Sequence, residues 1–271
     1  VLFRSHGGYR YNFLTYGLYV TFFPYVISGP IAYHREIIPQ LEAQDKKRIN
    51  WANIRRGLFI FSIGLFKKAA IADTLAVIAD GGFAAAGAPT FTEAWLTSLS
   101  YTLQLYFDFS GYTDMAIGVA LFFNIDIPAN FNSPYKSLSI QEFWRRWHIT
   151  LSRFLRDYIY IPLGGNRRSD IRTLTNLMVT FLIGGLWHGA AWNFIFWGAY
   201  HGAALIVHRL WRELRGAPET APGLWTRLTC IFLTFHMAAF GWILFRVKTI
   251  GDAGVMLRNL AVPALSRPDW L

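Results

Sequence analysis

The sequence predicts an all-α, polytopic integral membrane protein, a bundle of tilted and broken helices with interfacial or re-entrant helices. Of the 271 residues, 54% are hydrophobic and only 15% are charged, whereas about a quarter of a soluble domain is charged. Mean hydropathy is +0.28. Aromatic residues make up 17% of the chain, which is expected where Trp and Tyr form belts at the two bilayer interfaces.

Apolar runs mark the candidate spans in order along the chain. A helix needs about 20 apolar residues to cross a bilayer, and several of the runs are shorter. The runs cover Tyr11–Tyr33, Gly57–Ile78, Ala94–Phe109, Gly111–Phe123, Leu174–Trp187, Trp192–Leu210 and Leu228–Phe245. The two runs that meet at Ser110 and Gly111 form either one bent helix or a hairpin. Lys67 and Lys68 interrupt the second run, and we expect them to reach an interface or to face the protein interior.

The charges of the connecting loops predict an orientation. His34–Arg56 and Asn132–Arg172 are rich in Lys and Arg, whereas Gly81–Thr92 has neither. The positive-inside rule places the first two loops in the cytoplasm and the third outside. Basic loops beside anionic headgroups also account for the net charge of +10, so membrane lipids are the expected partners and nucleic acid is not. The single cysteine, Cys230, excludes an internal disulfide and a cysteine-cluster metal site.

The start of the chain does not read like the rest. The first residue is not Met, and Leu2–Ser5 resembles translated adapter sequence. We therefore expect residues 1–5 to be artefactual and the chain to be a fragment, with 1–271 forming a single domain.

A cytoplasmic, interfacial helix is predicted within the second basic segment, Asn132–Arg172. Ser139 and Glu142 have the spacing of a capping box, which predicts a helix that runs from there to about Tyr160. One helical stripe is apolar, with Trp144, Trp147, Leu151, Phe154 and Tyr158. The other is basic, with Gln141, Arg145, Ser152 and Arg156, flanked by Arg146 and Arg153 and with His148 at its edge. Such a helix lies flat on the membrane, and its arginines then anchor it to headgroups or, alternatively, bind phosphates of a cytosolic ligand.

The segment Gly184–Trp192, GGLWHGAAW, is the most informative stretch. An ionisable residue at membrane depth costs free energy and by default marks a functional site. Glycines let backbones approach closely, so we expect a helix break here and a tightly packed pocket around His188. The alternative is a buried packing histidine bonded to a backbone carbonyl.

Three blocks occur in a fixed order. The first is YFDFSGYTDMAIG at Tyr106–Gly118. The second is EFWRRWHITLS at Glu142–Ser152, which continues through LRDY into IPLGGNR. The third is GLWHGA at Gly185–Ala190. Together they resemble the membrane-bound O-acyltransferase family, over most of the chain. The similarity looks closest to the bacterial branch of alginate O-acetylation proteins and related peptidoglycan and polysaccharide O-acetyltransferases; the D-alanyl transferase of lipoteichoic acid is more distant.

The resemblance implies helices around a central tunnel, in a multi-pass protein of the bacterial plasma (inner) membrane. It implies an enzyme that moves an acyl group, acetyl in preference to D-alanyl, from a cytosolic thioester such as acetyl-CoA. The acceptor would be a hydroxyl of an extracytoplasmic polysaccharide or of a partner protein, an extracytoplasmic acyltransferase. No permanently bound cofactor is implied.

The resemblance also implies site residues. His188 matches the family's catalytic histidine, and His148 matches a second histidine shared by the bacterial branch. Asp108 and Tyr112 match the first block and are assigned to substrate binding without a defined role. Asp108 lies in an apolar stretch and needs a partner, for which we expect an arginine or a helix N-terminus. Independently of the resemblance, Arg145 and Arg156 share the basic stripe with His148, and we therefore assign them to the phosphates of the acyl donor.

The residues also suggest how the transfer would run. A base must take the proton of the attacking hydroxyl, and histidine is the commonest such base near neutral pH. A neutral His188 would accept this proton and then protonate the leaving thiolate. The indole N–H groups of Trp187 and Trp192, or Asn193, are candidates for binding the acyl carbonyl oxygen. No metal is predicted, because no carboxylate or cysteine lies at ligand spacing from His188.

Two other classes of protein remain open. A transporter or channel also has broken helices and intramembrane charges, although the repeat symmetry common in transporters is not evident here. A non-catalytic scaffold of a polysaccharide secretion complex would not require His188.

Overall fold

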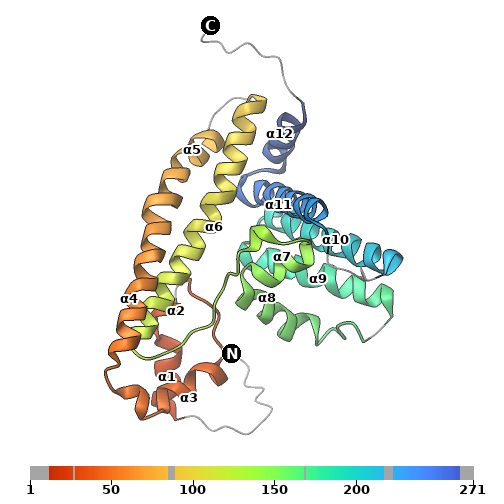
Figure 1. The fold of residues 1–271 in the computed structure, drawn as a ribbon. Helices are drawn as coiled ribbons and strands as arrows, with labels where there is room; N and C mark the ends of the chain where they lie inside the picture. Colours follow the sequence, from red (N-terminus) through yellow and green to blue (C-terminus); the bar gives the residue numbers. More distant parts are fainter. Residues whose placement is uncertain (1–11, 27, 85–88, 168, 217–221, 263–271) are drawn as a thin grey trace. The chain divides into compact units, whose positions relative to one another are not determined.

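The computed structural model describes residues 12–262, except 27, 85–88, 168 and 217–221. Throughout this described part the chain forms helices joined by turns and loops, without β-strands, which confirms the all-α prediction (Figure 1). The residues predicted to be artefactual, 1–5, lie outside the described residues.

The chain divides into two compact units. Unit 1 comprises Val1–Phe66 and Ser110–Ala129, and unit 2 comprises Lys67–Phe109 and Asn130–Leu271. The single domain over 1–271 stays a prediction.

Unit 1 begins with three helices, of which the first two lie where the sequence predicted one span. They are α1 (Phe13–Thr21), α2 (Phe23–Val26) and α3 (His34–Glu42). The prediction of one span over Tyr11–Tyr33 is wrong, because Pro24 lacks the amide proton that a continuous helix needs there. Unit 1 continues through η1 (Asp45–Lys47) and α4 (Trp51–Phe66), and it also contains the last part of α6 (Phe91–Phe122).

Glycines hold α4 and α6 close together in unit 1. A Cβ on Gly57 would lie 2.6 Å from the carbonyl oxygen of Gly118, and one on Gly64 would lie 2.6 Å from that of Gly111. Helix α6 is continuous across Ser110 and Gly111, so the single-helix alternative holds and the hairpin is wrong.

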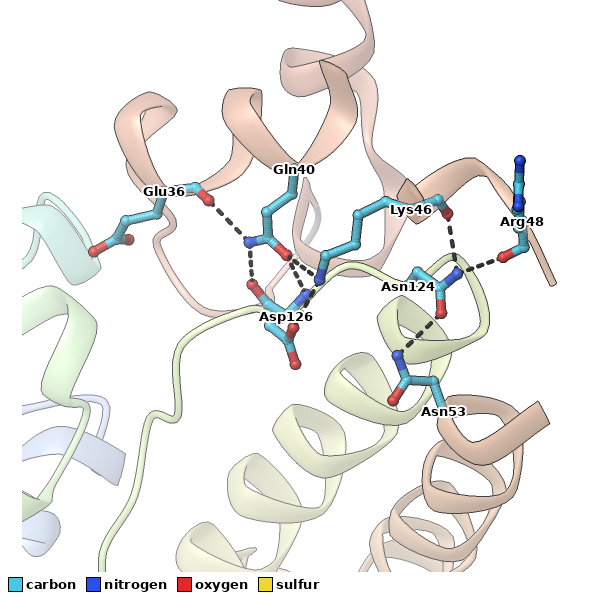
Figure 2. A network of polar contacts seen from close by, with 7 residues as sticks. All are labelled: Glu36, Gln40, Lys46, Arg48, Asn53, Asn124 and Asp126. Atoms are coloured by element: carbon cyan, nitrogen blue, oxygen red, sulfur yellow. Dashed lines mark hydrogen bonds and ion pairs between the residues drawn. The ribbon is translucent and has the colours of Figure 1, made fainter. Parts of the chain in front are cut away.

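Polar contacts tie the first basic loop to the end of α6 (Figure 2). The Asn124 amide donates to the carbonyl oxygens of Lys46, at 3.0 Å, and Arg48, at 2.6 Å. Its own oxygen accepts from Asn53 Nδ2 at 3.0 Å. Lys46 Nζ lies 3.1 Å from a carboxylate oxygen of Asp126. These contacts fix the position of Lys46 within unit 1.

Unit 2 begins with a π-helical segment, η2 (Lys67–Ala72), at the two lysines that interrupt the second apolar run. It leads into α5 (Asp73–Ala84) and includes the first part of α6. The chain then passes through η3 (Pro134–Lys136), α7 (Ile140–Arg146), α8 (Ile149–Leu155) and the π-helical η4 (Arg156–Tyr160).

The predicted continuous helix from Ser139 to Tyr160 is wrong, although its start is right. Ser139 is the N-cap of α7, and its hydroxyl accepts from the Glu142 amide at 3.2 Å. The Glu142 carboxylate accepts from the amide of Leu138, not of Ser139, at 2.7 Å. The helix breaks at His148, which has left-handed backbone dihedrals with φ at 42°.

Four further helices complete unit 2. They are α9 (Asp170–His188), α10 (Trp192–Arg215), α11 (Leu224–Arg246) and α12 (Ile250–Ala261). Helices α9, α10 and α11 enclose an aromatic core together with α7, and Trp144, Trp147, Trp197 and Trp242 are its largest members. The second sequence block contributes Phe143, Trp144 and Trp147 to this core.

Among the described helices, only α11 is both long and apolar enough to cross a membrane by length and composition. The multi-pass topology and the central tunnel stay predictions.

Candidate active site

His188 is the last residue of α9, at the tip of an antiparallel helix hairpin. Glycines bring α9 and α10 into contact: a Cβ on Gly185 would overlap the carbonyl oxygen of Phe194, and one on Gly198 would overlap that of Phe181. Helix α9 ends at His188 and α10 begins at Trp192, which confirms the predicted break. The turn is short, so His188 stays close to the first turns of α10.

Aromatic rings surround the His188 imidazole on several sides. Trp197 and Phe245 present edges at centroid distances of 5.2 and 5.0 Å, and Trp187 lies at 4.9 Å. Among the described residues, none forms a hydrogen bond to the imidazole. The packing alternative required such a bond to a carbonyl. The described residues therefore give no support to the packing alternative.

His188 lines a large cavity within unit 2, with a volume of about 1350 Å³. Helices α7, α8, α9 and α10 and the turn after η4 form its walls. Its charged lining residues are Arg145, Arg153, Arg156, Arg167, Arg209, Arg212 and Glu213. Of these six guanidinium groups, Arg209 pairs with Glu213 and Asp170, and Arg156 pairs with Asp157. The lining still carries an excess of positive charge, which favours an anion, and arginine forms bidentate hydrogen bonds with phosphate in particular.

The structure changes the predicted grouping of the arginines. Arg145 and Arg156 line the cavity as predicted, but so does Arg153, which the continuous-helix prediction placed farther round. The break at His148 resets the rotation of the following helix, and this removes the basis of the predicted stripes. Arg146 is not a cavity residue: its guanidinium pairs with Glu142 at 2.6 Å.

His148 lies between α7 and α8 and is 4% exposed. Its ring contacts Phe109 at a centroid distance of 4.8 Å and Trp187 at 6.1 Å. Burial lowers the pKa of His148 to about 3, and the nearby charge of His188 contributes to the shift. The two predicted histidines therefore lie in one neighbourhood, with Trp187 in contact with both.

Asn130 and Thr150 form a hydrogen-bonded cluster with His148 that the sequence reasoning missed. Asn130 is fully buried, and its side-chain oxygen lies 3.1 Å from His148 Nδ1 and 2.9 Å from the Thr150 hydroxyl. No local pattern could have found Asn130, because it lies 18 residues before its histidine partner. Trp197 and Phe245 were also missed, since apolar-run residues carry no separate signal for lining a site.

The three residues predicted to bind the acyl carbonyl oxygen, Trp187, Trp192 and Asn193, differ in their exposure. Asn193 is buried, and its amide donates to the carbonyl oxygen of Val247 at 3.2 Å. Trp187 and Trp192 are 55% and 71% exposed. A role for any of them in binding the acyl carbonyl stays a prediction.

Asp108 forms an ion pair with Lys68 at 2.6 Å, and Lys68 also pairs with Asp73 at 2.8 Å. The sequence reasoning expected an arginine or a helix N-terminus as the partner of Asp108, and that expectation is wrong. Tyr112 belongs to unit 1, whereas Asp108 and both histidines belong to unit 2. The structure therefore brings Asp108 near the site through its neighbour Phe109, and it leaves the assignment of Tyr112 a prediction.

Comparison with known proteins places these residues in a family context. The model of the membrane-bound O-acyltransferase family matches residues 2–248. A peptidoglycan O-acetyltransferase of Helicobacter pylori is 54% identical over 92% of this chain and 47% of its own length. A probable alginate O-acetylase of Pseudomonas aeruginosa is 43% identical over 92% of this chain and 46% of its own.

A teichoic acid D-alanyltransferase of Bacillus subtilis is more distant, with 29% identity over 85% of this chain and 60% of its own length. The chain spans about half the length of the O-acetyltransferase relatives that it matches. The family model covers both histidines and the arginine-lined cavity. On this match, which covers most of its length, the chain belongs to the membrane-bound O-acyltransferase family.

Proposed function

We propose that the protein is an O-acetyltransferase of the bacterial plasma (inner) membrane, which uses His188 as the base in acetyl transfer to a hydroxyl group. The observation that carries this proposal is the position of His188, unbonded within the described structure, on the wall of an arginine-lined cavity. Acetyl is preferred over D-alanyl because the relatives named for O-acetylation share 43–54% identity with the chain, against 29–31% for those named D-alanyltransferases.

The proposed reaction follows from the chemistry of a thioester and an alcohol. The neutral imidazole of His188 accepts the hydroxyl proton as the oxygen attacks the thioester carbonyl. A carbon–oxygen bond forms and the carbon–sulfur bond breaks, and the imidazolium returns its proton to the leaving thiolate. Such general base catalysis contributes roughly 10²–10⁴ to the rate.

The donor is a cytosolic thioester that carries phosphate, with acetyl-CoA as the first candidate. The charge of the cavity supports this proposal: Arg145, Arg153 and Arg156 come from adjacent helical segments and line the same space as His188. Each guanidinium can form charge-assisted hydrogen bonds with a phosphate oxygen. The donor is a substrate, and the proposal includes no permanently bound cofactor.

The acceptor is an extracytoplasmic polysaccharide, or an acyltransferase partner protein that passes the acetyl group on to one. The names of the relatives, which refer to peptidoglycan and alginate, support a glycan acceptor. A multi-pass topology with a tunnel would let the donor enter from the cytosol and the acceptor from the opposite side. Asp108, Tyr112, Trp187 and Asn193 complete the substrate-binding set of this proposal.

The test replaces His188 in the full-length protein, reconstituted in lipid. His188→Gln should reduce acetyl transfer at least about 100-fold while leaving membrane insertion and thermal stability close to wild type. Release of free thiol from acetyl-CoA reports the enzyme reaction directly, so it separates an acyltransferase from a transporter or channel. If His188→Gln retains more than about a tenth of the activity, the assignment of the base is wrong. If the wild type releases no thiol with any glycan present, a scaffold or transport role is favoured.

A further inference from the structure

The Asn130 side-chain oxygen receives three contacts at the junction of α7 and α8. It accepts from the Thr150 backbone amide at 3.2 Å and from the Thr150 hydroxyl at 2.9 Å, and it lies 3.1 Å from His148 Nδ1. All three residues are buried, with exposures of 0% for Asn130, 1% for Thr150 and 4% for His148. Water therefore does not compete for these contacts.

These contacts determine which way the Asn130 amide points. A backbone N–H can only donate, so the atom that faces the Thr150 amide must be the oxygen. With the oxygen facing His148, Nδ1 must carry a proton, because two acceptors at 3.1 Å would repel each other. A neutral imidazole has one donor and one acceptor nitrogen, which leaves Nε2 unprotonated.

Asn130 also takes over the capping of α8. His148 is the N-cap residue, yet its side chain makes no capping hydrogen bond. Instead, the Asn130 backbone and side-chain oxygens accept from the first two amides of α8, those of Ile149 and Thr150. His148 is held in a left-handed conformation, with φ at 42°, which is uncommon outside glycine and persists where the surroundings over-determine it.

We infer that Asn130 is a positioning residue: it holds His148 as the Nδ1–H tautomer, so that Nε2 is kept as a hydrogen-bond acceptor in the neighbourhood of His188. The importance of this acceptor for acetyl transfer rests on the proposed function, whereas the tautomer rests on the geometry alone. This arrangement also costs free energy, which supports a specific purpose for it. The Asn130 Nδ2 group has no hydrogen-bond partner among the described residues, and an unsatisfied buried donor is destabilising.

The neighbourhood of His148 is consistent with a neutral ring. Helix α6 contributes Phe109 and helix α9 contributes Trp187, both uncharged. His188 is the titratable group whose charge acts on His148, and it opposes protonation. Nothing in these contacts favours an imidazolium, so Nε2 remains an acceptor at neutral pH.

The tautomer can be measured without any substrate. The full-length protein is labelled with ¹⁵N-histidine in lipid nanodiscs, and the His148 signals are identified by their loss in His148→Asn. We expect a protonated Nδ1 and an unprotonated Nε2 in the wild type, and a shift toward the other tautomer in Asn130→Ala. Thr150→Val is the matched control, because it removes a donor to the same oxygen but leaves the Asn130–His148 contact. A wild-type signal from Nε2–H, or the same change in Thr150→Val as in Asn130→Ala, would overturn the inference.

Kinetics then test the consequence for the reaction. Asn130→Ala should lower kcat for acetyl transfer at least about tenfold, with the KM for the donor unchanged within about twofold. Asn130→Asp keeps an acceptor oxygen for the three contacts and should keep the Nδ1–H tautomer. Its negative charge should raise the pH at which His148 becomes protonated by about one to three units, read in the same spectra. An unchanged titration in Asn130→Asp would show that residue 130 does not contact the ring.

Failure of this inference and failure of the proposed function give different results. If His148→Asn retains full transferase activity, His148 has no part in the proposed reaction, while the spectra still decide its tautomer. If His148→Asn is inactive but the wild-type ring carries its proton on Nε2, the proposed function stands and the positioning role of Asn130 is wrong.

Discussion

Alanine substitution of the cavity arginines tests whether the cavity binds the donor. Arg145, Arg153 and Arg156 line the cavity with His188, whereas Arg146 pairs with Glu142 outside it. A hydrogen bond to a charged group contributes about 1.5–3 kcal/mol, which corresponds to roughly a ten- to hundredfold change in affinity. We therefore expect each of the three cavity variants to raise the KM for acetyl-CoA by about ten- to a hundredfold.

The structure indicates that Arg156→Ala will fold. The Arg156 side chain is 60% exposed, and its pair with Asp157 at 2.8 Å is close to solvent. Exposed ion pairs contribute about 0–1 kcal/mol, so the loss of stability in Arg156→Ala should be small. Arg146→Ala is the matched control, because it removes the same charge from the neighbouring position in α7 without altering the cavity. Its KM should stay within about twofold of wild type.

The assay is release of free thiol as a function of acetyl-CoA concentration, with the full-length protein in lipid. Lysine at position 156 should rescue only partly, because an ammonium group lacks the planar fork of arginine. The reasoning is refuted if all four alanine variants behave alike and only membrane association suffers. In that case the arginines are headgroup anchors.

Three other predictions address packing, pH and orientation. Gly185→Ala should destabilise the protein by about 1–3 kcal/mol or more, because the added methyl group would overlap the Phe194 carbonyl oxygen. In Gly184→Ala the methyl group would meet only a flexible leucine side-chain tip at 3.1 Å. Equal melting temperatures of the two variants would contradict this. Burial lowers the pKa of His148 to about 3, so below pH about 6.5 the unfolded state binds a proton that the folded state does not. The free energy of unfolding should therefore fall as the pH is lowered from 7.5 to 5.5, by about 1.4 kcal/mol more in wild type than in His148→Asn. Asparagine is chosen because it tolerates the left-handed backbone at this position. An identical pH dependence of melting in the two proteins would refute this prediction. Cysteine at position 156, in a background without the native cysteine, should react with an impermeant thiol reagent only from the cytosolic side, and labelling of intact cells would reverse the orientation.

Several features of the protein follow from local sequence alone. Ser139 caps a helix because a hydroxyl before an apolar run satisfies free amides of the first turn. Helix α9 ends at His188 because the following residue is Gly189, and glycine has a low helix propensity. The motif blocks around His188 and His148 also identified the family. These signals depend on residues close together in the chain, which is why sequence reasoning captured them.

Other expectations failed where distant residues decide the structure. Helical periodicity predicted one continuous helix from Ser139 to Tyr160, but His148 has left-handed backbone dihedrals and the helix breaks there. Asn130 satisfies the amides that the break exposes. The partner of Asp108 was expected to be an arginine or a helix end, yet it is Lys68 from a helix 40 residues earlier in the chain.

The sequence by itself determined the all-α class, the family, the break at His188 and the identity of the two histidines. Only the tertiary structure decided that Arg153 joins Arg145 and Arg156 in the cavity, and that Asn130 bonds His148. The physical reason is the same in both cases. Helix rotation and hydrogen-bond partners depend on where the backbone breaks and which remote segment packs there, and neither is encoded in the spacing of neighbouring residues.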